Sequence, residues 1–597
     1  MKPALLLLAA FLAACAAPSP APVTTAAPPI ETAASIATYE PEGGQFRKLP
    51  TAATGPAVVS AADPRAAEAG AAMLRRGGSA ADAAIATMIA LTVVEPQSSG
   101  IGGGAFLLWH DPATGELTTL DGRERAPSAA TPDRFLKADG SPMNFREAVP
   151  GGKSVGVPGV IRLAAEMHAR WGRLPWAALF EPSIVMARDG ILLSERFVRF
   201  AGFREEMLRA TPSGATFLGP DGKVWPAGHQ LKQPELARTL EEIAQAGPDA
   251  FYSGRIGQEI IRAVETAPIN PARITAGDLA DYRVTERAAL CRPYRGYRIC
   301  TMGPPSAGGI AVLQILGQLE RFDLATLGPD NLLSWHLMAE SMRLAFADRE
   351  AFGGDADFQP VPVAGLLSPE YLAARSRLIR MDRAMADAAP GRPEGAMARV
   401  GGPLADVPAT SHLVAADGEG RVANLTSTIE APWGSGLIAA GFVLNNELTD
   451  FDFLPERDAR PAINRVEPGK RPRSSMSPTL VFGPDGKLKA AFGAAGGATI
   501  IAQVAKSIIA YVDWGLSVED SIAAPQIVAD RRGIRYEPET RLDAMAAGLK
   551  ALGHNEVAPA SLPLKGNAVA REGRLWRGAA DPRSEGAAIV ATKEGSR

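Results

Sequence analysis

The sequence predicts an α/β (α+β) protein built as a layered sandwich of helices and sheets. Helical stretches alternate along the chain with short β-rich pieces, and the clearest hairpin patterns lie in the last third. Of the 597 residues, 46% are hydrophobic and 21% are charged, a globular composition with ample material for a large core. Because strands and helices are interspersed, we favour a layered fold over a helix bundle or an all-β fold.

The first 15 residues have the pattern of a targeting segment. Lys2 supplies a positive charge, residues 5–12 are apolar, and small residues precede Cys15. This pattern resembles a bacterial lipoprotein signal and predicts cleavage before Cys15 with a lipid on its sulfur; a plain secretory signal with an incidental cysteine is the alternative. Residues 16–45 are rich in Pro and Ala and are expected to form a tether. We therefore expect a periplasmic or cell-envelope protein that meets the membrane only through a lipid anchor.

Helix signals are clearest in the first third of the chain. A helix is expected from residue 64 until Gly77 and Gly78 close it. Ser79 opens the next helix with Asp82 as its capping partner, and this helix is apolar nearly all round, which predicts burial. Further helical stretches are expected near 157–170, 233–246, 330–350 and 498–513.

Two cysteines flank a short hairpin pattern. Cys291 and Cys300 enclose RPYRGYRI, which reads as two short strands around a Gly turn. In an oxidising compartment the two thiols are candidates for a disulfide across the hairpin. Two separate buried thiols are the alternative, since spacing alone does not fix the geometry.

Charge and histidine spacing argue against several kinds of partner. The net charge is −3 and no basic run with interleaved aromatics occurs, so we expect no nucleic acid. The sequence predicts no metal and no other cofactor, because no two histidines stand at ligand spacing and no cysteine cluster accompanies them. The histidines are His110, His168, His229, His336, His412 and His554.

Two glycine-rich motifs suggest chemistry that their context does not support. Ser154 lies in GKSVG, the Gly-x-Ser-x-Gly pattern of a nucleophile elbow, but the next helix begins only after Gly159. Residues 100–105, GIGGGA, resemble a dinucleotide-binding loop but lead into a strand instead of a helix. For the second motif we favour close packing of backbone on backbone.

A hairpin pattern near residue 410 brings threonines together. Residues alternate on both sides of DGEG, and a turn centred on Glu419 places Thr410 opposite Thr428 and His412 opposite Thr426. Opposed residues point to one face with Cβ atoms about 5 Å apart. An ordinary Thr-rich strand pair is the alternative.

Thr410 is a candidate N-terminal nucleophile. The Gly/Pro-rich segment 386–409 before it is expected to be flexible and exposed, so a chain break at its end is tolerated. A new α-amine, with a pKa of about 8, is a suitable base for the Thr410 hydroxyl, and Thr428 would orient that hydroxyl. Gly496 and Gly497 stand just before a helix and offer N–H donors for a developing oxyanion, although a simple strand-to-helix turn is the alternative.

Further polar residues suggest a clamp for an α-amino acid. Arg123 with Ser474 and Ser475 suits a carboxylate. Glu447 and Asp450 suit an ammonium group. Taken singly, each of these residues could instead be an ordinary solvated residue on the surface.

From about residue 50 to the C-terminus the chain resembles the γ-glutamyltransferases, N-terminal nucleophile hydrolases that cut themselves into two subunits. The resemblance implies a four-layer αββα sandwich of two interlaced subunits, residues 46–409 and 410–597, with cleavage between Ala409 and Thr410. The segments that carry it, in order, are GGSAADAAIA, EPQSSGIGGGAFLL, LDGRERAP, GGKSVGVPG, GPDAFYSG, PPSAGG, LAFADRE, ATSH, LNNELTDF, KRPRSSMSPT and GAAGG.

The resemblance also implies the reaction and the role of each site residue. Thr410 would attack the γ-amide of glutathione or a similar donor, and water or an amino acid or peptide acceptor would resolve the γ-glutamyl ester. Thr428 is implied as its hydroxyl partner. The remaining roles are α-carboxylate binding by Arg123, Ser474 and Ser475, α-amine binding by Glu430, Glu447 and Asp450, and the oxyanion hole at Gly496 and Gly497.

Two departures from the family pattern bear on the substrate. Glu430 stands where many members have Asn, and the segment 452–470 is short and lacks the lid tyrosine of some members, which predicts a more open site. Relatives that act as cephalosporin (glutaryl) acylases give an alternative function. A non-catalytic secreted binding protein is a further alternative, which the presence of Thr410, Thr428 and Gly496 disfavours.

Overall fold

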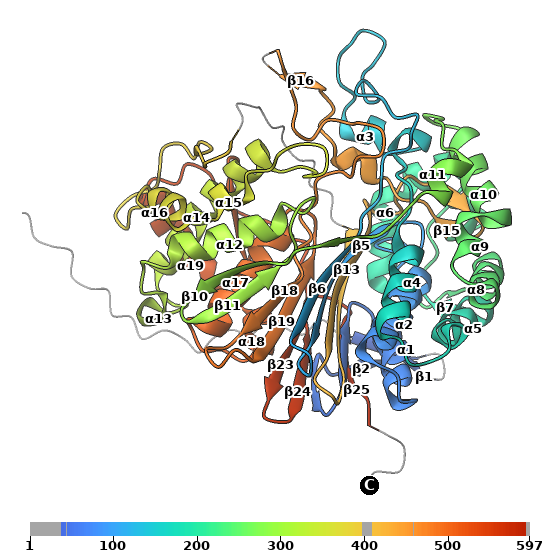
Figure 1. Ribbon diagram of the computed structural model, residues 1–597, viewed down its shortest axis with the longest axis horizontal. Coiled ribbons are helices and arrows are strands. Elements are labelled where there is room, and N and C mark those ends of the chain that lie inside the picture. Colours follow the sequence, from blue (N-terminus) through green and yellow to red (C-terminus); the bar gives the residue numbers. More distant parts are fainter. Residues whose placement is uncertain (1–37, 43–44, 397–408, 458, 593–597) are drawn as a thin grey trace, which may run out of the picture.

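The structure is a computed structural model that describes residues 38–42, 45–396, 409–457 and 459–592. Cys15, the predicted leader and most of the tether lie outside the described residues, as does the 397–408 part of the segment before the predicted cut. The elements are labelled as in Figure 1. Among the described helices, none is long and apolar enough to cross a membrane.

Two seven-stranded antiparallel sheets form the centre of the molecule. Sheet I has the order β25-β4-β12-β13-β5-β6-β9, and sheet II has the order β10-β11-β18-β19-β23-β24-β3. The strands of sheet I are β4 (Val58–Ala61), β5 (Gly104–Asp111), β6 (Glu116–Gly122), β9 (Thr285–Arg287), β12 (Ala409–Ala416), β13 (Val422–Glu430) and β25 (Ala587–Val590). Those of sheet II are β3 (Ala52–Gly55), β10 (Leu290–Tyr294), β11 (Tyr297–Thr301), β18 (Thr479–Phe482), β19 (Leu488–Ala495), β23 (Lys565–Glu572) and β24 (Leu575–Ala580).

The two sheets pack face to face, and helices cover both outer faces (Figure 1). The result is the four-layer αββα sandwich that the family resemblance predicts. Sheet I is covered by α1 (Pro64–Arg75), α2 (Ala80–Val94) and α4 (Val160–Trp171), and α5 (Glu181–Asp189) packs on α2. Over sheet II lie α12 (Gly308–Leu319), α17 (Thr499–Val512) and α18 (Val518–Ala523), and α14 (Leu332–Phe352) packs on α12.

Shorter elements complete the described fold. The remaining helices are α3 (Phe145–Ala148), α6 (Glu195–Ala210), α7 (Gly214–Phe217), α8 (Pro234–Ala246), α9 (Asp249–Tyr252), α10 (Gly254–Glu265), α11 (Ala276–Ala280), α13 (Leu324–Leu327), α15 (Val363–Leu366), α16 (Pro369–Ser376) and α19 (Arg541–Ala551). The 3-10 helices are η1 (Gly152–Ser154), η2 (Trp176–Leu179) and η3 (Glu447–Asp450). The remaining strands are β1 (Thr38–Glu42), β2 (Gln45–Leu49), β7 (Ile191–Leu192), β8 (Gln230–Leu231), β14 (Ile438–Ala439), β15 (Phe442–Val443), β16 (Glu456–Arg457), β17 (Arg460–Pro461), β20 (Ile527–Asp530), β21 (Gly533–Tyr536) and β22 (Val557–Pro559).

The sequence signals for helix ends are realised in the structure. Pro64 is the first residue of α1, where its missing N–H costs nothing, and Gly77 follows the helix with a φ of +88°. Ser79 and Asp82 form the predicted capping box of α2, and every residue of that helix is buried. The helix is buried because it packs on β12 and β13 of sheet I and is contacted by the helices α1, α4 and α5.

Both sheets combine strands from before and after residue 410. In sheet I, β12 and β13 lie between β4 and β5, and in sheet II, β18 and β19 lie between β11 and β23. Each of these neighbours is hydrogen-bonded in register. A cut between Ala409 and Thr410 would therefore leave the two products joined through both sheets.

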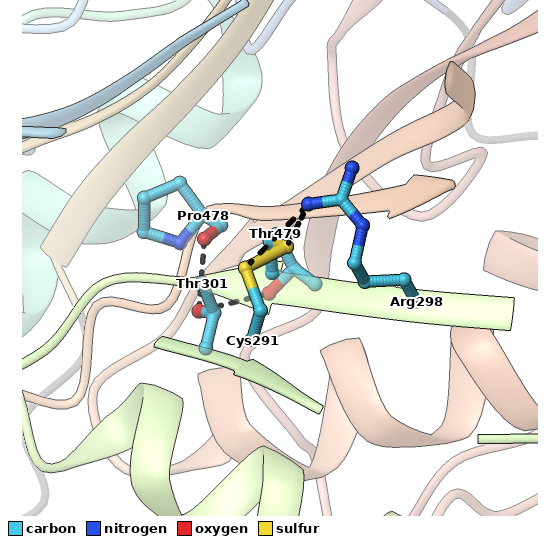
Figure 2. The surroundings of a disulfide bond; sticks show 6 residues. Cys291, Arg298, Thr301, Pro478 and Thr479 are labelled. Atoms are coloured by element: carbon cyan, nitrogen blue, oxygen red, sulfur yellow. Dashed lines mark hydrogen bonds between the residues drawn. A yellow bond between two sulfur atoms is a disulfide. The ribbon is translucent and has the colours of Figure 1, made fainter. Parts of the chain in front are cut away.

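The β10–β11 hairpin carries a disulfide (Figure 2). Cys291 and Cys300 are direct register partners, and their Sγ atoms are 2.07 Å apart. The Arg298 guanidinium lies beside the pair, with Nη1 3.4 Å from the Cys300 sulfur. The Thr301 hydroxyl donates to the Pro478 carbonyl at 2.9 Å and so ties the hairpin to the rest of sheet II.

Candidate active site

The hairpin of β12 and β13 has the register that the sequence predicts. Thr410 pairs with Thr428 and His412 pairs with Thr426. The Oγ1 atoms of Thr410 and Thr428 are 3.2 Å apart, and both side chains are buried. Two hydroxyls are therefore held in hydrogen-bond contact at the start of the strand.

The peptide bond between Ala409 and Thr410 is intact in the structure, and its carbonyl is unusually well contacted. The Ala409 oxygen accepts hydrogen bonds from Oγ1 of Thr410 at 2.7 Å and from Oγ1 of Thr428 at 2.8 Å. The Thr428 hydroxyl in turn accepts the backbone N–H of Glu430 at 2.8 Å. The ladder register shifts between Ala409 and Thr410, so this peptide departs from regular strand pairing. The predicted nucleophile, Thr410, and a second hydroxyl that donates to the carbonyl thus meet at one peptide bond.

A pocket opens beside this peptide bond, lined by residues from distant parts of the chain. Thr410 and Thr428 come from sheet I, and Gly497 comes from the turn between β19 and α17. All but one of the predicted site residues line the pocket; Gly496 alone is missing from its lining. The predicted residues in the lining are Arg123, Thr410, Thr428, Glu430, Glu447, Asp450, Ser474, Ser475 and Gly497.

Arg123 is in direct contact with two of the acids of the pocket. Its Nη1 pairs with Glu447, and its Nη2 is 2.6 Å from Oδ2 of Asp450. From the sequence, Arg123 was predicted to bind a ligand carboxylate, and Glu447 and Asp450 a ligand ammonium. The predicted carboxylate site and the predicted ammonium site are therefore in contact. This arrangement suits an α-amino acid, because its ammonium and carboxylate groups are bonded to the same carbon.

Three carboxyl groups and one arginine line the pocket, so acidic groups outnumber basic ones there. Burial raises the pKa of Glu447 to about 7, with Arg123 opposing the shift and Asp450 adding to it. Burial and the nearby Asp450 and Glu447 hold the pKa of Glu430 well above its usual range. Burial and Glu447 do the same to the pKa of Glu124, which follows Arg123 in the chain. A ligand ammonium would offset this excess of acid, since an added cation favours ionised carboxylates.

Ser474 and Ser475 are held by the turn that follows β11. The Ala307 N–H donates to the Ser474 carbonyl at 3.0 Å, and Ser306 pairs with Ser474 in a parallel bridge. The Ser475 hydroxyl accepts a hydrogen bond from Nη2 of Arg349 at 2.7 Å. The β10–β11 hairpin leads directly into this turn, so the hairpin supports the serine end of the pocket.

The oxyanion candidates lie where β19 ends and α17 begins. Gly496 has a φ of +131° and Gly497 a φ of +61°, a conformation that favours glycine. A Cβ on Gly496 would stand 2.4 Å from the Pro563 carbonyl oxygen, so no larger residue fits. The Gln503 side chain donates to the Ala495 carbonyl at 2.8 Å and fixes the strand end before the two glycines.

Several supporting residues were not singled out from the sequence. Asn446 donates to the Glu430 carboxylate and, through Oδ1, accepts the Ala431 N–H at 2.9 Å. Asn445 donates to the Gly102 and Gly156 carbonyls at 2.7 and 2.9 Å. Asn445, Asn446, Arg349 and Glu124 all lie within segments that carry the family resemblance, but no local pattern revealed what they contact.

The two glycine-rich motifs have structural roles. The Ser154 hydroxyl donates to the Val149 and Gly151 carbonyls at 2.6 and 2.9 Å, so it is held by its own loop. A Cβ on Gly102 would stand 2.1 Å from the Val443 oxygen, and one on Gly103 would stand 2.0 Å from the Thr428 oxygen. The GIGGGA segment therefore packs backbone on backbone against β13 and β15, as predicted from the sequence.

Comparison with known proteins agrees with this geometry. The gamma-glutamyltranspeptidase family model matches residues 66–591. The glutathione hydrolase proenzyme of Bacillus subtilis (strain 168) is 36% identical over 89% of this chain and 91% of its own length. The acylase ACY 1 proenzyme of Pseudomonas sp. (strain SE83) is 33% identical over 88% of this chain and 92% of its own length.

A solved structure has the same architecture. The crystal structure of cephalosporin acylase from Bacillus halodurans superposes with a TM-score of 0.78 at 26% identity, covering 96% of this chain and 99% of the other. With the family model matched over most of its length, the chain belongs to the gamma-glutamyltranspeptidase family.

Proposed function

We propose that this protein is a proenzyme that cuts itself between Ala409 and Thr410 and then hydrolyses or transfers γ-glutamyl groups from glutathione and related amides. The observation that carries the proposal is the contact of both threonine hydroxyls with the Ala409 carbonyl, beside a pocket with one arginine and several acids. The B. subtilis relative, named as a glutathione hydrolase proenzyme, supports the same function.

Self-cleavage would begin with attack by Oγ1 of Thr410 on the Ala409 carbonyl carbon. The Thr428 hydroxyl, already bonded to that carbonyl oxygen, would stabilise the negative charge that develops there. Collapse of the adduct would break the C–N bond and pass the hydroxyl proton to the departing nitrogen. The resulting ester between Ala409 and Thr410 would be hydrolysed by water, leaving a carboxylate on Ala409 and a free amine and hydroxyl on Thr410.

Turnover would repeat this chemistry on a donor. The Thr410 amine would take the hydroxyl proton during attack on the γ-amide carbon and return a proton to the leaving amine. Gly496 and Gly497 would present N–H groups to the oxyanion, and Thr428 would hold the nucleophile. Water or an amino acceptor would then attack the γ-glutamyl ester and free Thr410. No metal or other cofactor has a part in these steps.

Recognition of the donor would use both charged ends of its glutamyl group. Arg123 with Ser474 and Ser475 would receive the α-carboxylate. Glu430, Glu447 and Asp450 would bind the α-ammonium. Part of the ion pairing that these acids now make with Arg123 would then be made with the ligand.

Glutaryl acylase activity is the second candidate. Two similar proteins are named as acylases, and the segment 452–470 forms only a small hairpin of β16 and β17 with its flanking loops. A glutaryl group has no ammonium, however, and would leave the buried acids without an added cation. We therefore rank a γ-glutamyl donor first.

The two candidates are separated by a matched pair of chromogenic amides. We expect kcat/KM for γ-glutamyl-p-nitroanilide to exceed that for glutaryl-p-nitroanilide by about 10²-fold or more, because a buried acid left without its cation costs several kcal/mol. The Asp450→Asn variant should reduce this ratio by acting on the γ-glutamyl amide. Equal or faster cleavage of the glutaryl amide would overturn the ranking.

Export and lipid attachment at Cys15 are part of the proposal and rest on the sequence. Cleavage before Cys15 would leave a mature protein of residues 15–409 and 410–597, and the lipid on Cys15 would hold it in the cell envelope. Membrane fractions from cells that express the wild type should contain the protein, and a Cys15→Ala variant should move to the soluble fraction. Equal distribution of both proteins would exclude the anchor.

A further inference from the structure

A buried polar cluster lies immediately behind the nucleophile. Ser411 follows Thr410, and successive side chains of a strand point to opposite faces, so Ser411 faces away from Thr428. Its hydroxyl donates to Oε2 of Glu95 at 2.6 Å. The Lys565 ammonium donates to the same carboxylate oxygen at 2.7 Å and lies 3.4 Å from the Ser411 hydroxyl. These three residues expose at most 2% of their surface.

Lys565 also belongs to the support of the oxyanion turn. It is the first residue of β23 and the register partner of Ala495, the last residue of β19 before Gly496. Its backbone N–H donates to Oε1 of Gln503 at 3.1 Å, and Nε2 of Gln503 donates to the Ala495 carbonyl at 2.8 Å. One residue therefore contacts the neighbour of Thr410 through its side chain and the support of the oxyanion turn through its backbone.

The charge of this cluster calls for an explanation beyond packing. A buried ion pair costs desolvation of both ions and is seldom more stabilising than an apolar pair of the same volume. The donor pocket accounts for the acids around Arg123, but it does not contain Glu95 or Lys565. Self-cleavage would create a carboxylate on Ala409 and an α-amine on Thr410, and this amine would lie one residue away from the contact between Ser411 and Glu95.

We propose that Lys565 and Glu95 are positioning residues that hold the Thr410 strand against the oxyanion turn and balance the charge beside the new N-terminal amine. The proposal rests on the proposed self-cleavage. With both ions present, their opposite effects on the amine largely cancel, and the amine stays available as a base near neutral pH. Burial lowers the pKa of Lys565 to about 8, with Glu95 opposing the shift, which agrees with a desolvated site.

Other charged groups would also act on the Thr410 amine. Glu95 and Lys565 lie on the face of β12 that points away from the pocket. Arg196 on α6 is 3.7 Å from the Glu95 carboxylate, and its charge acts on Lys565. Among the described residues, the charged groups on the pocket side are Arg123, Glu124, Glu430, Glu447 and Asp450. On the other side, Glu95, Arg196 and Glu585 act on Lys565.

Removing one ion at a time should move the amine pKa in opposite directions. In Lys565→Met, the Glu95 carboxylate loses its nearer cation and keeps only Arg196, at 3.7 Å. The more negative surroundings favour the ammonium, so the acid limb of the kcat/KM profile should move up by roughly one pH unit or more. In Glu95→Gln, the uncompensated lysine disfavours the ammonium, so the limb should move down. The double variant Glu95→Gln/Lys565→Met removes both charges and should return close to the wild-type limb.

The experiment first establishes by intact mass that the wild-type chain is cut, because an uncut wild type would reject the proposed function itself and not this inference. The pH dependence of kcat/KM for γ-glutamyl-p-nitroanilide is then measured for the wild type and the three variants. Lys489→Met is the matched control, because Lys489 forms an exposed ion pair with Asp485 on the same sheet. This control should leave the limb unchanged.

Opposite shifts that cancel in the double variant would support the proposal. The proposal would also be supported if Lys565→Met stays uncut while the double variant is cut, because the Glu95 carboxylate without Lys565 would then be the cause. An unchanged limb in every variant that is cut would overturn the proposal, whatever the loss of rate. Failure of all three variants to be cut would also overturn it, because the double variant should escape the charge imbalance.

Discussion

The Thr428 hydroxyl makes the most direct test of how the Ala409–Thr410 bond is activated. It lies 2.8 Å from the Ala409 carbonyl oxygen and 3.2 Å from Oγ1 of Thr410, and it accepts the Glu430 N–H. Thr428→Ala removes the donor to the oxygen on which charge develops. Loss of one preorganised donor of this kind costs about 10²–10³ in rate, or roughly 2.7–4 kcal/mol.

The same substitution also lowers the free energy of unfolding. It leaves the buried Glu430 N–H without its acceptor, which costs about 1–3 kcal/mol. Removal of the γ-methyl adds about 1 kcal/mol. Because these losses are below the 5–15 kcal/mol typical of a native domain, the variant should still fold, which separates loss of cleavage from loss of structure.

The assay follows the uncut chain over time. Wild type, Thr428→Ala and Thr428→Ser are purified in the uncut state from brief low-temperature expression, and the two fragments are quantified by gel and intact mass at 25 °C. Thr428→Ser keeps the hydroxyl and should be cut within about tenfold of the wild-type rate, whereas Thr428→Ala should be slower by about 10²-fold or more. Cleavage of Thr428→Ala at the wild-type rate, in a chain with unchanged circular dichroism, would refute the role given to this hydroxyl.

Three further predictions test the pocket, the oxyanion turn and the core. In Arg123→Gln, the buried Glu447 and the partly buried Asp450 lose their cation. Breaking a buried ion pair costs about 3–5 kcal/mol, so kcat/KM for a γ-glutamyl donor should fall by about 10²-fold or more. Self-cleavage should persist in this variant, and equal loss of both reactions would contradict the separate role of the arginine. Gly496→Ala should lower kcat by about 10²-fold through displacement of the oxyanion donors, because its Cβ would stand 2.4 Å from a carbonyl oxygen; Gly486→Ala, at a positive φ of +74° with open space around it, is the control that should keep full kcat. Burial lowers the pKa of His412 to about 3, below its unfolded value of about 6.5, so its contribution to stability is complete above about pH 6.5 and is lost as the pH falls toward 3, by about 1.4 kcal/mol per pH unit. Urea unfolding of the uncut Thr410→Ala chain at pH 6.5, 5.5 and 4.5 should show this loss, and the added His412→Gln substitution should reduce it; an unchanged slope would assign the loss to other groups.

Local pattern predicted much of the fold. The helices expected near 157–170, 233–246, 330–350 and 498–513 begin and end within three residues of α4, α8, α14 and α17. These predictions succeeded because caps, turn glycines and apolar periodicity act over a few residues. The β12–β13 register was predictable for the same reason, since DGEG fixes the turn and the alternating pattern fixes which residues face each other.

Contacts between distant segments were beyond such patterns. Glu95 and Lys565 are 470 positions apart, and Arg349 meets Ser475 across 126 positions. Nothing in the local sequence around Lys565 or Arg349 distinguishes these residues from solvated surface residues. The contact of Arg123 with Glu447 and Asp450 was likewise not predicted. Charge complementarity indicates which residues suit a ligand, but not which of these residues contact one another when no ligand is bound.

The central claim is that Thr410 becomes a new N-terminus by its own chemistry. Intact mass of the purified chain, compared with a Thr410→Ala control, tests it most directly. The account predicts two wild-type fragments that meet between Ala409 and Thr410, and a single uncut control chain. A wild type that remains one chain, or a control that is cut at the same bond, would contradict it.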